Sequence, residues 1–100
     1  MPSTDDLRSA IAELHRTWRI YLWQSDDDNL ERAANALKSS DTSHDELSRL
    51  AKQALEFANL ALPAVLSATR LPADRPESAA AREALNAHRD LDDMIAGYAG

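Results

Sequence analysis

The sequence predicts an all-α protein, and three observations support this fold class. Alanine, leucine, glutamate, arginine and aspartate dominate the composition, which is typical of helices, and valine occurs only at Val65. Apolar residues recur at intervals of three and four in successive segments of the chain. The two glycines, Gly97 and Gly100, stand near the end of the sequence, so hairpin turns that need glycine at positive φ are not expected earlier.

The first helix is predicted over residues 5–24. Ser3 or Thr4 can cap it, and the aspartates that follow suit the positive end of the helix dipole. Its apolar residues are spaced four, three, four and three positions apart, which predicts one buried stripe: Leu7, Ile11, Leu14, Trp18 and Tyr21.

The second helix is predicted over residues 27–38. The three aspartates at 26–28 resemble a metal site, but acidic residues belong at the start of a helix, and a hard cation needs further ligands from elsewhere. We therefore interpret them as an N-cap and first turn. Asp28 and Arg32 stand one turn apart, which predicts an ion pair.

The third helix is predicted over residues 44–70. Ser43 and Glu46 have the spacing of a capping box, and His44 between them is expected to be solvated. Most of the circumference of this helix is apolar, so we expect it to be the central element. Pro63 lies on its narrow polar stripe and is expected to bend or break the helix.

The fourth helix is predicted over residues 76–96, with Pro76 in its first turn and Gly97 as its stop. Its inward stripe is expected at Ala81, Leu85 or Ala84, His88, Leu91, Ile95 and Tyr98. Together the segments predict one domain over residues 1–100, an antiparallel bundle of three or four amphipathic helices. In the alternative arrangement, three helices of one protomer are completed by dimerisation.

Composition excludes several classes of function. The formal net charge of −6 argues against direct binding to nucleic acid or to an anionic membrane. Cysteine is absent, and no glutamate is followed by histidine at the spacing that di-iron bundles use. We expect no metal, no cofactor and no catalytic residue. The chain shows no signal peptide and no apolar run long enough for a membrane span, so a cytoplasmic location is expected.

One pair of residues suggests an enzyme. Arg82 precedes His88 by six positions on the predicted fourth helix. This pair resembles the Arg-x4–6-His motif of the helical HEPN-type ribonucleases, in which such a pair acts on the scissile phosphate. The resemblance implies a ribonuclease that uses Arg82 and His88. The competing interpretation is a histidine at the core edge that is hydrogen-bonded to a neighbour, with Asp92 one turn away.

A second alternative is an acidic protein that imitates the charge of DNA. This hypothesis rests on the acidic residues that are expected at helix starts, in loops and on the last helix. They are Asp26, Asp27, Asp28, Asp41, Asp45, Glu46, Asp90, Asp92 and Asp93.

The least ordinary feature is an apolar pair on the back of the first helix. At about 100° per residue, Ile20 and Trp23 lie roughly 140–160° from the stripe that begins at Leu7. Arg16 and Arg19 flank them, and aromatic and apolar side chains beside arginine have the composition of a binding hot spot. The other explanation is that another helix covers this face.

The sequence therefore favours a small acidic protein-binding module without catalytic activity. Small acidic helical proteins commonly act as adaptors, chaperones, immunity proteins or inhibitors of a larger protein. This expectation rests on analogy with that class of protein. We expect partner binding through Arg16, Arg19, Ile20 and Trp23, either in a homodimer or with a different protein. The abundance of alanine, and of arginine over lysine, suggests a bacterial or phage origin.

Overall fold

The computed structural model describes residues 3–22 and 28–99, with side chains described up to Ala96. These residues form five helices and no strand, which confirms the all-α prediction. The helices are α1 (Thr4–Leu22), α2 (Asn29–Ala36), α3 (His44–Ala58), α4 (Leu62–Ala68) and α5 (Pro76–Ala99). The predicted end of the first helix, at residues 23–24, and the predicted start of the second, at residue 27, lie outside the described residues.

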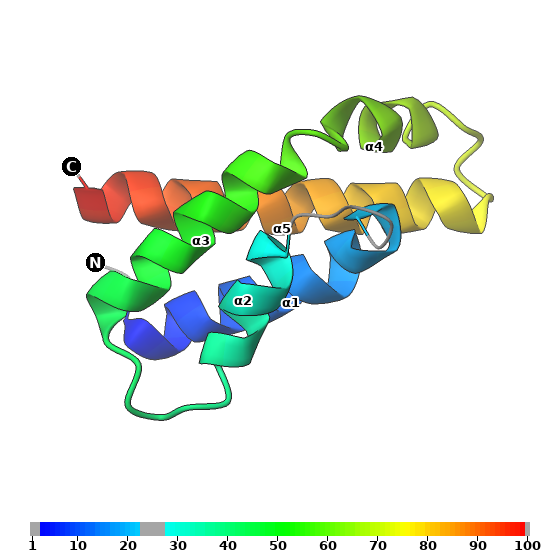
Figure 1. Ribbon diagram of the computed structural model, residues 1–100. Helices are drawn as coiled ribbons and strands as arrows, with labels where there is room; N and C mark the ends of the chain where they lie inside the picture. The colour runs from blue at the N-terminus through cyan, green and yellow to red at the C-terminus, as the bar shows by residue number, and fades with distance from the viewer. Residues whose placement is uncertain (1–2, 23–27, 100) are drawn as a thin grey trace.

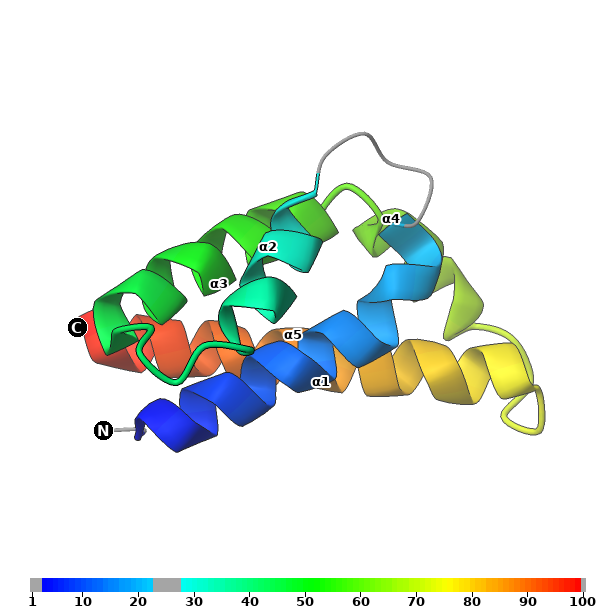
Figure 2. The same ribbon diagram turned by 60° about the horizontal axis from the view of Figure 1, so that its bottom comes forward.

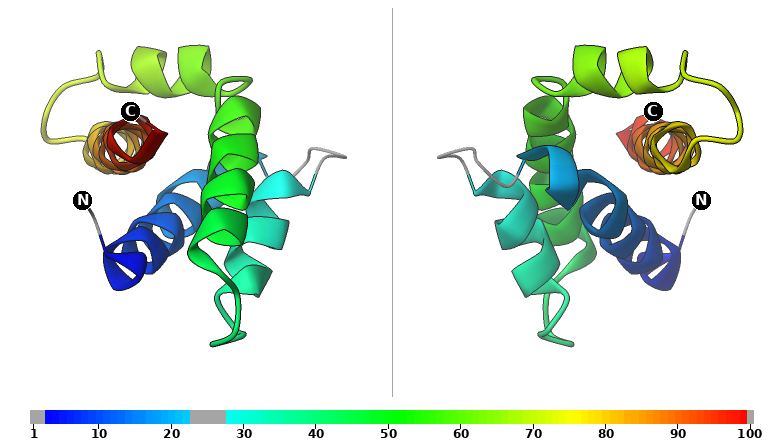
Figure 3. Two further views of the ribbon diagram at one scale, coloured as in Figure 1. Left: turned by 90° about the vertical axis from the view of Figure 1, so that its left-hand side faces the viewer. Right: turned by 90° about the vertical axis from the view of Figure 1, so that its right-hand side faces the viewer.

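The helices pack around the α1–α5 pair. α1 and α5 lie side by side and run in opposite directions (Figures 1 and 2). α3 packs against both, and α2 packs against α1 and α3 on the side of α3 that faces away from α5 (Figure 3). α4 lies against α5 on the side opposite to α1 (Figures 1 and 3). The described chain thus has one helix more than the sequence predicts.

The extra helix arises because the predicted helix over residues 44–70 is interrupted. The hydrogen bonds tighten to three-residue steps after α3, with Leu60 N–H donating to Phe57 O at 3.1 Å. Pro63, which has no N–H, then stands in the first turn of α4. Of the two outcomes expected at Pro63, a bend or a break, the structure shows the break, which divides the predicted helix over residues 44–70 into α3 and α4. The carbonyl of Asn59 accepts Leu62 N–H at 3.3 Å.

The predicted stop at Gly97 is also wrong, because α5 continues to Ala99. A glycine ends a helix when it takes up a positive φ, and Gly97 does not. Without that conformation, glycine is tolerated inside a helix at a cost of about 1 kcal/mol relative to alanine.

Local signals at the starts of α1, α3 and α5 are confirmed. Ser3 Oγ accepts Asp6 N–H at 3.1 Å, and the Asp6 carboxylate accepts Ser3 N–H at 3.2 Å, which is a reciprocal capping box. Ser43 Oγ accepts Glu46 N–H at 3.1 Å at the start of α3. α5 begins at Pro76, as predicted. Asp28, by contrast, stands at the N-cap of α2 without a side-chain capping bond, and α2 ends at Ala36 rather than at residue 38.

All five helices contribute to one buried cluster with Trp18 at its centre. Of the predicted stripe of α1, Tyr21 is half-buried and the other four residues are buried. On α5, Ala84 rather than Leu85 is fully buried. A small side chain there leaves room for the Trp18 indole, whose Nε1–H donates to the Ala84 carbonyl oxygen at 2.7 Å. This contact sets how α1 lies on α5.

Candidate functional site

The outer face of α1 carries the predicted binding residues. Ile20 is 55% exposed, and Arg16 and Arg19 are exposed as well. Ile20 thus stands apart from the buried stripe, as its helical position predicts. Trp23, the fourth predicted binding residue, lies outside the described residues.

Arg16 joins this outer face to α5. Its guanidinium bonds to the Glu13 carboxylate one turn earlier and lies 3.4 Å from the Glu83 carboxylate of α5. The hydrogen bond with Glu13 raises the pKa of Arg16 and lowers the pKa of Glu13. All three side chains are at least half exposed, so the bridge adds little to stability and chiefly orients Arg16.

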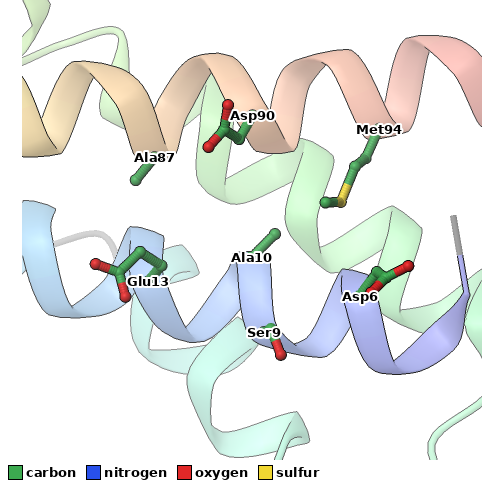
Figure 4. A pocket seen from close by; sticks show the side chains of 7 residues that line it. All are labelled: Asp6, Ser9, Ala10, Glu13, Ala87, Asp90 and Met94. Atoms are coloured by element: carbon green, nitrogen blue, oxygen red, sulfur yellow. The ribbon is translucent and has the colours of Figure 1, made fainter.

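A groove runs between α1 and α5 beside this bridge (Figure 4). Its volume is about 320 Å³, and apolar side chains make much of its surface. Buried Ala10 and Ala87 line it together with the half-buried thioether of Met94. The polar residues that line it are Asp6, Ser9, Glu13 and Asp90.

The three carboxylates of the groove stand in different electrostatic situations. Asp6 belongs to the capping box of α1, and Glu13 is paired with Arg16. Among the residues that the structure describes, the carboxylate of Asp90 has neither a hydrogen bond nor an ion pair. No three acidic, histidine or cysteine side chains of the described chain converge as metal ligands do. The carboxylates of Asp6, Glu13 and Asp90 place negative charge along the groove.

His88 of α5 lies at the edge of the core, where it contacts Trp18 of α1 and Asn59 at the α3–α4 break. Its Nε2 is 3.2 Å from Asn59 Oδ1, and its ring centroid is 5.6 Å from that of Trp18. Burial lowers the pKa of His88, and the nearby charge of Asp92 opposes that shift. Since an amide oxygen only accepts, the Nε2–H of His88 donates to Asn59 Oδ1, and this bond connects α5 with the break.

The two residues of the ribonuclease hypothesis have different partners in the structure. The Arg82 guanidinium donates to the hydroxyl of Ser78, one turn earlier on α5, at 3.0 Å. Ser78 is fully buried, so this bond satisfies a hydroxyl that is removed from water. His88, in contrast, contacts Asn59 and Trp18. The structure accordingly assigns both side chains contacts that stabilise the fold.

The acidic residues of the DNA-mimic hypothesis are spread over several elements. Asp28 pairs with Arg32 at 2.9 Å, as the sequence predicts, and Glu46 pairs with Arg49. Asp90 lines the groove, whereas Asp41 lies in the α2–α3 connection. Asp45 lies in the first turn of α3, and Asp92 and Asp93 are exposed on α5. Asp26 and Asp27 lie outside the described residues.

Several side-chain contacts that the sequence did not predict connect the helices. Arg8 donates to the carbonyls of Leu37 and Ser39 just after α2, the latter at 3.1 Å. His44, expected to be solvated, is partly buried and lies 3.0 Å from Thr4 Oγ1. No sequence signal marks these contacts, because each joins segments that are distant along the chain.

No protein family matches this sequence, and no similar curated protein or solved structure was found. Over the part of the chain that the structure describes, none of the helices combines the length and the apolar character that crossing a bilayer requires.

Proposed function

We propose that this protein is a non-enzymatic protein-binding module, and that the outer face of α1 is its docking surface. The observation that carries the proposal is Ile20, a large apolar side chain that is 55% exposed beside the exposed Arg16 and Arg19. Such a side chain gains roughly 1.5–3 kcal/mol when it is fully buried. A partner that covers Ile20 would recover part of that free energy.

The surroundings of Ile20 also suit a docking surface. Arg16 is held by Glu13 and Glu83, so its guanidinium is already oriented before a partner arrives. Arginine beside a large apolar residue is the composition of binding hot spots. The partner is either a second copy of the chain or a different protein, for which this module acts as an adaptor, chaperone, immunity protein or inhibitor.

The test is the double variant Ile20→Ser with Trp23→Ser, compared with the wild-type chain. Association is measured by sedimentation velocity of the purified protein and by co-purification from the native host. We expect the variant to keep the helical signal and melting temperature of the monomer and to lose association, because Ile20 lies outside the buried cluster.

The matched control is Leu60→Ser with Leu66→Ser. Both leucines are exposed, at 74% and 43%, and neither lies on α1. This control should associate as the wild type does. An equal loss in both double variants would mean that association follows general surface hydrophobicity. Unfolding of the Ile20 and Trp23 variant, or a wild-type chain that binds nothing, would overturn the proposal.

A further inference from the structure

The α1–α5 groove and the outer face of α1 follow each other along α1, and Arg16, whose guanidinium reaches Glu83 of α5, stands between Glu13 and Ile20. Asp6, Glu13 and Ile20 stand seven residues apart, so they lie nearly in line along α1, about 10 Å from one to the next. Asp6 and Glu13 line the groove, and Ile20 follows two turns beyond Glu13. A partner segment that covers Ile20 and extends along α1 toward its N-terminus passes Arg16 and reaches the groove at Glu13.

The groove combines two properties that together select a chemical type of occupant. Its apolar floor, made by Ala10, Ala87 and Met94, accepts aliphatic chain. Its rim carries carboxylates, of which Asp90 is unpaired among the described residues. Lysine and arginine match both properties, because their stems are apolar and their heads are cationic. The volume of about 320 Å³ is at the lower end of the usual range for ligand pockets.

We propose that this groove docks a basic amphipathic segment of another protein. Lysine or arginine stems lie on the floor, and their heads meet Asp90 and the other rim acids. Further along the same segment an apolar residue covers Ile20, where Arg16 and Arg19 would repel a basic one. The inference rests on the proposed function, since it names the partner of the same face. A second copy is a poorer occupant, because each chain carries a formal net charge of −6 and would bring like charges together.

The test uses a short amide-capped peptide that places lysine and leucine at helical spacing. Binding is followed by NMR of the Met94 methyl group, which lies in the groove; the only other methionine is Met1. We expect the peptide to shift the Met94 signal in a saturable manner. Salt should weaken binding, because the rim charges are accessible to solvent. A peptide with glutamate in place of lysine should leave the signal unmoved.

Variants at Asp90 separate the groove from net charge. Asp90→Asn should weaken peptide binding about twofold, and Asp90→Arg roughly tenfold, since the second change also adds repulsion. The controls are Asp41→Asn and Asp41→Arg, which make the same charge changes on the exposed α2–α3 connection. These controls should bind as the wild type does.

Three outcomes would overturn the inference. The first is a Met94 signal that the peptide does not move. The second is equal weakening by the Asp41 and Asp90 variants, which would indicate attraction by net charge alone. The third is a Met94 signal that moves with protein concentration in the absence of peptide, which would identify a second copy as the occupant. None of these outcomes affects whether the Ile20 and Trp23 variant loses association. The proposed function is therefore tested separately, by the association measurements.

Discussion

The indole N–H of Trp18 in α1 donates to the carbonyl oxygen of Ala84 in α5 at 2.7 Å. The same indole lies 5.6 Å from the ring of His88, one helical turn further along α5. Trp18 is fully buried, so a single side chain combines a large apolar contact with a directional bond between the two longest helices. The walls of the groove depend on how these two helices lie against each other.

Trp18→Phe is expected to lower the free energy of unfolding by roughly 1–3 kcal/mol, which combines the lost hydrogen bond with a small cavity. Trp18→Ala is expected to cost about 3–5 kcal/mol. Urea denaturation followed by circular dichroism measures both. A Trp18→Phe variant as stable as the wild type would show that the bond to Ala84 contributes nothing.

Stability is expected to fall as the pH drops below about 6.5, because burial lowers the pKa of His88 in the folded state. The unfolded chain, in which this histidine has its ordinary pKa of about 6.5, then binds the proton more readily. The stability that neutral His88 contributes is fully present above about pH 6.5. It is lost as the pH falls from about 6.5 toward the lower pKa of His88 in the folded state. Asp92, whose charge opposes the shift, reduces the size of this effect.

The measurement for His88 is the free energy of unfolding of the wild type and of His88→Gln between about pH 8 and 5, above the range in which most carboxylates titrate. The wild type should lose stability over this window and the variant should lose less. Parallel curves for the two proteins would assign the pH dependence to other groups. His88→Gln is also expected to leave association unchanged, and wild-type protein that cleaves RNA while this variant does not would favour the ribonuclease hypothesis.

Arg8→Met is expected to destabilise the protein by about 1–2 kcal/mol, since Arg8 donates to two carbonyls just beyond the end of α2. Arg89→Met is the matched control, because Arg89 is exposed and, among the residues that the structure describes, bonds within its own helix, to Asn86 at 3.1 Å. The control should change stability by less than about 0.5 kcal/mol. Thermal unfolding of both variants decides the question, and equal effects would contradict the role of Arg8.

Gly97→Ala is expected to raise stability by about 0.5 kcal/mol, because α5 passes through Gly97 without a positive φ and alanine is the better helix former. Circular dichroism should show equal or higher helicity. A glycine that ended the helix at positive φ would respond in the opposite direction, so a loss of stability would restore Gly97 as the stop.

Features within one or two helical turns could be predicted from the sequence. The caps at Ser3 and Ser43 and the ion pair between Asp28 and Arg32 follow from residue spacing alone, because their partners are at most four residues apart. Helical periodicity likewise separated buried Trp18 from exposed Ile20. The fold class and the exposure of the predicted binding residue Ile20 therefore lie within what the sequence determines.

Tertiary structure decided the relations between helices. Pro63 allowed either a bend or a break in the third predicted helix, and only the folded chain shows a break, where Asn59 bonds with His88. The groove depends on α1 lying against α5, which brings Asp90 to the same site as Asp6 and Glu13. Helical spacing determines which face of a helix is apolar, but not which neighbour covers it. That choice depends on how side chains such as Trp18 and Ala84 fit together across the core.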